Sequence, residues 1–210
     1  RHSSVDLAQL SQCRSIDEVI SGLKGTIYYS PLESLRQKGQ AVLPACETAV
    51  DMLYFKTVWK IKEKYLSGQE KKDLTQCFGT RMDMLNLQWI CRAKKYYHLP
   101  EGEIYAMIIP ISLHLKKTEI RAMAQAEDVE QVYALIRNSW YGRLDLGNLE
   151  KGQSLEEPCR EVIDRIYELT SRKEPYSASV LNSYLYFKER EIEKIITTIE
   201  RIRYGVAAGI

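Results

Sequence analysis

Apolar residues near the end of the chain recur at alternating steps of three and four positions. Such spacing places the side chains on one side of an α-helix. It predicts a long helix near residues 177–204 with a buried apolar stripe formed by Leu181, Leu185, Ile192, Ile195, Ile199, Ile202 and Val206. One position of the stripe is taken by Lys188, which is therefore predicted to lie on or beside the buried side.

Similar periodicity, interrupted by Ser, Gly and Pro at the expected helix ends, runs through the rest of the chain. It predicts helices at about 15–24, 31–38, 45–67, 70–98, 101–109, 118–126, 128–139, 155–172 and 177–204. Only residues 112–115 could form a short strand, so the predicted fold class is all-α. In the 45–67 helix, one face is predicted from Val50, Tyr54, Val58, Ile61 and Tyr65.

Two segments of the chain repeat the same arrangement of polar residues. Asn86, Arg92 and Lys94 have the spacing of Asn182, Lys188 and Arg190. A weaker match aligns residues 18–32 with residues 131–144, and the aromatic pair Trp140-Tyr141 belongs to it. Internal repetition is typical of helical scaffolds. We therefore predict two helical units, residues 1–112 and 113–210.

Composition excludes several classes of protein. The net charge of +2, from 30 cations and 28 anions, gives no support to a nucleic-acid binder. The five cysteines are dispersed without a C-x-x-C pair, which indicates reduced thiols rather than a disulfide framework. The longest apolar run, residues 104–111, is too short to span a bilayer, which takes about 20 residues.

Motifs for catalysis and for cofactor binding are absent from the sequence. It contains no G-x-G-x-x-G, no Walker A loop and no G-x-S-x-G. His2, His98 and His114 lack the spacing of metal ligands. We therefore predict no catalytic residue, no metal, no cofactor and no small-molecule substrate.

The candidate functional residues are cations and aromatics within the repeated segments. A cation on an apolar stripe must extend to water or find a carboxylate. Lys188 and Arg92 are therefore interpreted as members of buried pairs between helices, with contact to a partner protein as the alternative. Trp140 and Tyr141 have the same two interpretations, core or interface. Asn86, Lys94, Asn182 and Arg190 complete the set, as structural motif or possible interface.

These same residues carry a resemblance to a known family. The segment Tyr-Leu-Tyr-Phe-Lys-Glu-Arg-Glu-Ile at 184–192 and the closing Ile-Arg-Tyr-Gly at 202–205 resemble the end of the central-stalk connecting subunit of V/A-type rotary ATPases. That subunit is called C in bacterial and archaeal complexes and d in vacuolar ones. Asp83, Asn86, Arg92 and Lys94, followed by Ile108-Ile109-Pro110, look like its internal motif.

The resemblance implies an all-helical, funnel-like subunit of three related units around a pseudo-threefold axis. Because only two units are found and the first residue is Arg, we expect the leading unit to lie outside this chain. The resemblance further implies a non-catalytic coupling subunit between the rotor shaft and the membrane proteolipid ring. Its complex moves H⁺ or Na⁺, and its membrane contact, at the cytoplasmic face, is indirect. The alternatives are a free-standing cytosolic helical-repeat adaptor and, less favoured, a helical enzyme.

Overall fold

The structure is a computed structural model that describes residues 5–144, 146 and 154–205. Its described part is all-α, and none of its residues forms a strand, including residues 112–115. Each predicted helix is present, with ends within about two residues of the predicted ones. The sequence patterns missed only short elements, a four-residue helix near the start and a 3₁₀ turn at Trp140–Arg143.

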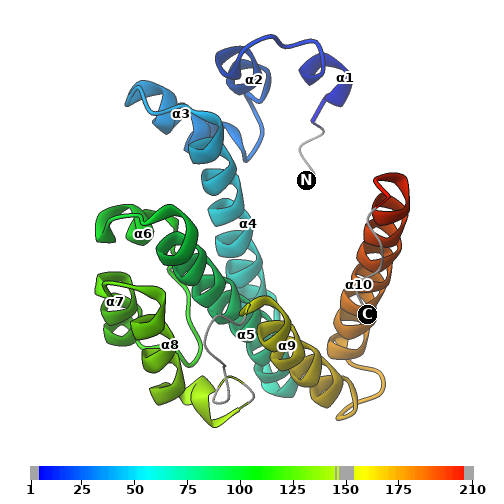
Figure 1. Ribbon diagram of the computed structural model, residues 1–210. Helices are drawn as coiled ribbons and strands as arrows, with labels where there is room; N and C mark the ends of the chain where they lie inside the picture. The colour runs from blue at the N-terminus through cyan, green and yellow to red at the C-terminus, as the bar shows by residue number, and fades with distance from the viewer. Residues whose placement is uncertain (1–4, 145, 147–153, 206–210) are drawn as a thin grey trace.

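The first half of the chain forms α1 (Leu7–Leu10), α2 (Ile16–Gly22), α3 (Tyr29–Gln37), α4 (Leu43–Tyr65) and α5 (Gly68–Arg92). A π-helical turn at Ala93–Tyr97 extends α5 and leads to α6 (Glu101–Met107). The second half forms α7 (Lys117–Gln125), α8 (Val129–Asn138), the 3₁₀ turn, α9 (Glu156–Ser171) and α10 (Ala178–Arg203). Figure 1 shows α4 and α10 leaving the body of the molecule as two separate rods.

Helix α5 is the centre of the molecule. Buried residues occur on all its sides, from Asp73 to Cys91, whereas a surface helix buries one stripe only. Its neighbours are α4, α6, α8, α9 and α10, with α9 packed along its length. The main core joins α5 to α6, α7, α8, α9 and the first half of α10, so this core includes residues from both sides of position 112. The division into two repeated units stays a prediction.

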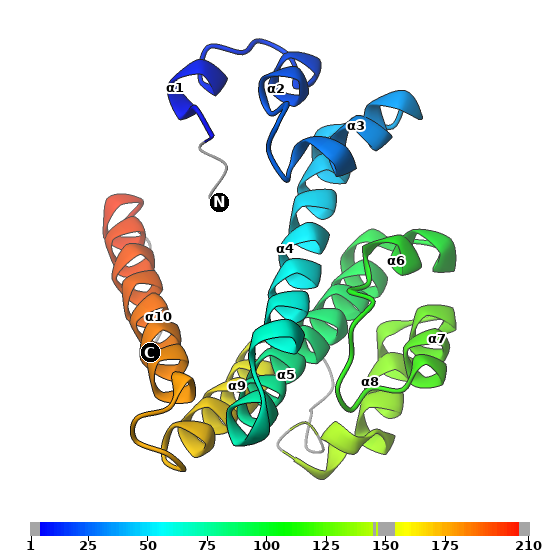
Figure 2. The same cartoon turned by 180° about the vertical axis from the view of Figure 1, so that it is seen from behind.

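A second, smaller core lies at the far end of α4 (Figure 2). It is centred on Ile20, Leu23 and Leu32, and every residue in it lies between positions 5 and 50. A third cluster, around Phe55, Met82 and Ile109, fixes the other end of α4 to α5. Helix α4 is therefore a rod that joins a small N-terminal core to the main one.

The predicted buried face of α10 is wrong. The described residues of the stripe on α10, from Leu181 to Ile202, are all exposed, and Val206 lies outside the described residues. Instead α10 docks through Ser179, Ser183 and Tyr186, because small residues allow close approach to α9. On α4, the predicted face is exposed at Tyr54, Ile61 and Tyr65. Helical spacing locates an apolar face but does not say whether this chain covers it.

Candidate functional site

The concave surface between α5, α9 and α10 is the candidate interaction site, and we call it the charged cleft. Its deeper part has a volume of about 250 Å³, and an adjoining depression along α9 and α10 has about 690 Å³. The floor is apolar, from Leu85, Ile163 and Tyr186, and the walls carry Arg81, Arg92, Arg160, Arg190, Lys194, Arg201, Glu156, Glu157, Glu189 and Glu193. Cations slightly outnumber carboxylates on these walls.

One side of the charged cleft is fixed by Asp164 of α9. Its carboxylate accepts hydrogen bonds from the Tyr186 hydroxyl at 2.7 Å and from Nη1 of Arg190, which lies 2.7 Å from each carboxylate oxygen. The Arg190 side chain is only 13% exposed, so this ion pair is screened less than a surface pair. Burial and the bond to Asp164 both raise the pKa of Tyr186. This contact is the main polar anchor of α10 on α9.

Removing the Asp164 carboxylate is expected to loosen α10. Asp164→Ala leaves a largely buried guanidinium and a buried hydroxyl unpaired, which should lower the free energy of unfolding by about 2–4 kcal/mol. Denaturant titration measures the loss. Lys188→Ala is the matched control on the same helix, because it removes an exposed pair with Glu191 and should change stability by less than about 0.5 kcal/mol. Equal losses in both variants would contradict this anchor.

Of the predicted site residues, Arg92 and Arg190 meet at the charged cleft. Arg92 pairs with Glu156 of α9, so the prediction of a pair between helices is confirmed. The prediction that Arg92 is buried is wrong, since its side chain is 48% exposed. The other wall residues include Arg81, whose guanidinium lies 3.7 Å from the carboxylate of Glu189 on α10.

The prediction for Lys188 is wrong in both respects. The side chain is 52% exposed, and its ammonium lies 2.6 Å from Glu191, one turn away on the same helix. It is neither buried nor paired with another helix. The physical reason is that the apolar stripe to which Lys188 belongs lies on the solvent side of α10, where a lysine costs nothing to hydrate.

Asn86 and Tyr141 make contacts in the interior of the protein and do not line the charged cleft. The Asn86 side chain bonds both backbone groups of Ile109, donating to its oxygen at 3.1 Å and accepting from its nitrogen at 2.8 Å. Tyr141 is fully buried and donates to Asp83 at 2.8 Å, so its assignment to the core is confirmed. Trp140 is at the surface and stacks on His114, with ring centroids 3.6 Å apart.

Lys94 and Asn182 also lie away from the charged cleft. Lys94 is half-buried in the π-helical turn. Asn182 is half-buried near Cys77 and Tyr167, and its amide nitrogen has no hydrogen-bond partner among the described residues. The two repeated segments therefore use their matching positions differently, and the arginine that each contributes to the charged cleft stands at a different position of the repeat.

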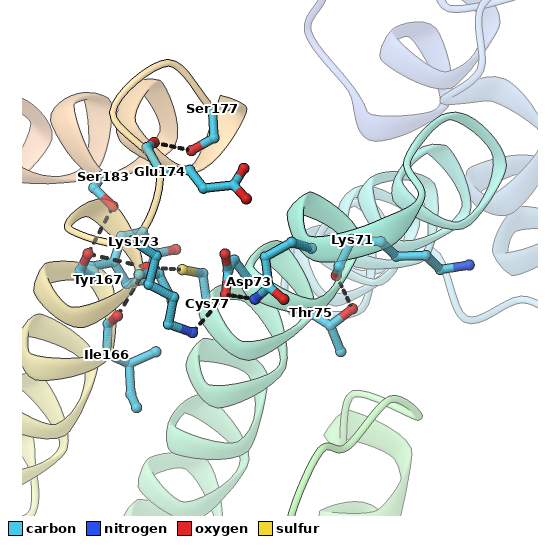
Figure 3. Close-up of polar contacts among 12 residues, drawn as sticks. Lys71, Asp73, Thr75, Cys77, Ile166, Tyr167, Lys173, Glu174, Ser177 and Ser183 are labelled. Atoms are coloured by element: carbon cyan, nitrogen blue, oxygen red, sulfur yellow. Dashed lines mark hydrogen bonds and ion pairs between the residues drawn. The ribbon is translucent and has the colours of Figure 1, made fainter.

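A polar junction where α5, α9 and α10 meet was not predicted from the sequence (Figure 3). Asp73, almost fully buried, bonds Lys173 at 2.7 Å and Gln69 at 2.9 Å. Ser183 donates to the backbone oxygen of Tyr167 at 2.9 Å. The contacts of Asp73 with Lys173 and of Ser183 with Tyr167 link residues 100 and 16 positions apart, so no spacing rule could have shown that these residues meet.

Three of the cysteines are buried in the main core. Burial raises the pKa of Cys77 to about 11 and that of Cys91 to about 12, and raises the pKa of Cys159 further. These thiols stay protonated near neutral pH and are poor nucleophiles. No cluster of His, Cys, Asp or Glu among the described residues could hold a metal ion.

Within the described part of the chain, no helix is both long and apolar enough to cross a membrane.

Comparisons with known proteins place these features in context. The family model described as ATP synthase (C/AC39) subunit matches residues 1–209. The C subunit of the A-type ATP synthase of Pyrococcus abyssi is 26% identical over 205 residues, which cover 94% of this chain and 54% of that protein. The protein of the same name from Methanobrevibacter smithii is 24% identical over 206 residues, with 93% and 53% covered. The chain thus spans about half the length of these relatives. No solved structure matches it.

Proposed function

The chain belongs to the ATP synthase (C/AC39) subunit family, and we propose that it acts as a non-catalytic coupling subunit of a V/A-type rotary ATPase. In this role it links the central rotor shaft to the proteolipid ring and serves the movement of H⁺ or Na⁺ by the complex. Its place is the cytoplasmic face of the membrane, which it contacts only through the ring. The observation that carries the proposal is the family match over residues 1–209.

The mechanical demands of such a role agree with the packing of the main core. A coupling subunit must transmit torque without yielding, so its helices must be fixed to one another over long distances. Helix α5 carries buried residues on all its sides, and α10 is held to α9 by the Asp164–Arg190 ion pair. Densely packed interiors transmit strain because they have low compressibility. These contacts support the proposal that force passes through α5 and α9.

The charged cleft is proposed as the surface for a partner subunit. It combines an apolar floor with charged walls, and Arg160, Lys194 and Arg201 on those walls are accessible to a partner. An apolar centre with a charged rim is typical of protein interfaces. We infer that a segment of the rotor shaft with acidic side chains binds there.

The test is recovery of partner subunits from membranes. A tagged chain expressed in its own host should co-purify with shaft and ring subunits after mild solubilisation. The double variant Arg160→Glu, Lys194→Glu should lower that recovery about tenfold, because reversing rim charges weakens and slows association. The control is Lys117→Glu, Arg121→Glu on α7, a helix outside the charged cleft, which should leave recovery unchanged.

Three outcomes would contradict the proposal or a part of it. Recovery of the chain only from the membrane-free fraction, with other proteins and no ATPase subunit, would support the free-standing adaptor. Equal loss of partners in the cleft variant and the α7 control would show that the charged cleft is not the contact surface. It would not contradict the coupling role. Intact, coupled complexes assembled without this chain would end the coupling role itself.

A further inference from the structure

The second half of α10 extends beyond the rest of the molecule. Every residue from Glu191 to Arg203 is exposed, whereas the residues that α10 buries, Ser179, Ser183 and Tyr186, lie in its first half. Both views show this part of the helix apart from the other elements (Figures 1 and 2). A free-standing helix of this length gains no stability from packing against its own chain.

This half of α10 carries a continuous apolar stripe, which we call the isoleucine seam. Its members are Ile192, Ile195, Ile196, Ile199 and Ile202, each between 50% and 76% exposed. Since each residue turns a helix by about 100°, the isoleucine seam lies roughly half a turn from Ser183 and Tyr186, on the side opposite the docking face. The chain therefore cannot cover the seam with the helices that hold α10.

The spacing of the isoleucine seam is that of a coiled coil. Ile192 and Ile199 are seven positions apart, as are Ile195 and Ile202, which makes them the a and d positions of two successive heptads. Large exposed apolar patches mark interaction sites. A seam with this repeat fits a second helix with the same repeat.

The charges beside the isoleucine seam are complementary when the helix is turned end for end. Glu189 stands before the seam and Arg203 at its end, both at e positions of the heptads. In an antiparallel pair, e positions lie opposite e positions of the partner. Turning the helix round therefore brings Glu189 of each copy opposite Arg203 of the other. Within its own chain, Glu189 makes a longer ion pair with Arg81, at 3.7 Å.

We propose that the isoleucine seam binds a second copy of this chain, forming an antiparallel pair of α10 helices. In this register Ile192 packs on Ile202 of the second copy, and Ile195 packs on Ile199. The twofold axis crosses the helices near Thr197. This inference is independent of the proposed function, because it rests only on the pattern and exposure of α10.

Other alignments of the two α10 helices give less favourable contacts between the same residues. A shift of one heptad places Lys188 opposite Ile199 of the second copy, where an ammonium would lose its hydration. A further heptad shift places Glu189 opposite Glu189, a repulsive contact. A parallel pair that extended to position 188 would bring the two Lys188 side chains together. Only the first antiparallel register satisfies both the apolar layers and the charges.

The expected dimer is weak, because the interface covers about four helical turns and falls at the low end of specific interfaces. Sedimentation velocity of the whole chain from about 1 to 300 µM should show a monomer at low concentration and a dimer at high concentration. Ile199→Glu should abolish the dimer without a change in melting temperature, since the side chain points away from the core. Ile61→Glu on α4 is the matched control, because Ile61 is 52% exposed and Ile199 is 58% exposed, and it should dimerise normally.

Charge reversal tests the antiparallel register. Glu189→Arg and Arg203→Glu should each weaken dimerisation at least about fivefold, because each creates two like-charge contacts, and the double variant should restore it. In a parallel pair the two positions are far apart, so the double variant would not recover. A chain that stays monomeric at every concentration, a dimer that survives Ile199→Glu, or a double variant without recovery would each overturn the proposal. A seam that binds only a different protein would do the same.

Discussion

Asp83→Ala is expected to lower the free energy of unfolding by about 4 kcal/mol or more, the largest effect of any single polar substitution in the described part of the chain. Asp83 is fully buried in α5. Its carboxylate accepts hydrogen bonds from the backbone nitrogens of Leu113, His114 and Leu115 and from the hydroxyl of Tyr141. Alanine leaves four donors without an acceptor, and the two that are buried, on Leu115 and Tyr141, each cost about 1–3 kcal/mol before relaxation.

Denaturant titration of the variant measures this loss, and Tyr141→Phe is its control. Phenylalanine keeps the ring in the core and removes one of the four donors, so we expect a loss of about 1–2 kcal/mol. Since most domains are stable by only about 5–15 kcal/mol, this loss should remove a large fraction of the total stability of the protein. A variant as stable as Tyr141→Phe would show that the segment 113–115 finds its partners elsewhere.

Gly142→Ala is the second substitution with a large expected effect. A Cβ atom at position 142 would stand 1.9 Å from the backbone oxygen of Arg137, and a backbone atom cannot give way as a side chain can. The 3₁₀ turn Trp140–Arg143 must then move, and with it the Tyr141 hydroxyl that bonds Asp83. We expect a loss of about 3 kcal/mol or more.

Thermal unfolding of Gly142→Ala can be compared directly with a second glycine variant. Gly102 lies inside α6, and a Cβ atom there meets no atom within 4 Å. Gly102→Ala should therefore raise stability by about 0.5–1 kcal/mol, through the helix propensity of alanine. A melting temperature that moves the same way in both variants would contradict the steric account of position 142.

The helices of this protein could be predicted from the sequence, but the outer surface could not. Periodicity located α4, α5 and α10 because the spacing of apolar residues and the Gly or Ser residues at helix ends are local features of the sequence. The same periodicity misplaced Lys188 and the isoleucine seam, since a stripe has the same spacing whether it faces the core or solvent. Burial depends on which helix lies opposite, and that is a matter of tertiary packing.

The polar contacts of the candidate site also depend on tertiary packing, which the sequence does not show. Arg92 was predicted to pair with another helix, which was correct, although the burial on which that prediction rested was wrong. Its partner Glu156 is 64 positions away, and the pair between Asp73 and Lys173 spans 100 positions. No sequence rule reaches across such separations. The role of Asp83 was equally hidden, since three of its four donors are backbone nitrogens.

The small core at the tip of α4 has a consequence for how the protein opens. Its residues lie within positions 5–50, and its centre is only Ile20, Leu23 and Leu32, so it buries far less apolar surface than the core around α5. Regions that bury little apolar surface exchange their amide hydrogens through local openings, well below the free energy of global unfolding. Amides of α2 and α3 should therefore exchange orders of magnitude faster than those of α5. We therefore expect the core within residues 5–50 to unfold at a lower temperature than the core around α5.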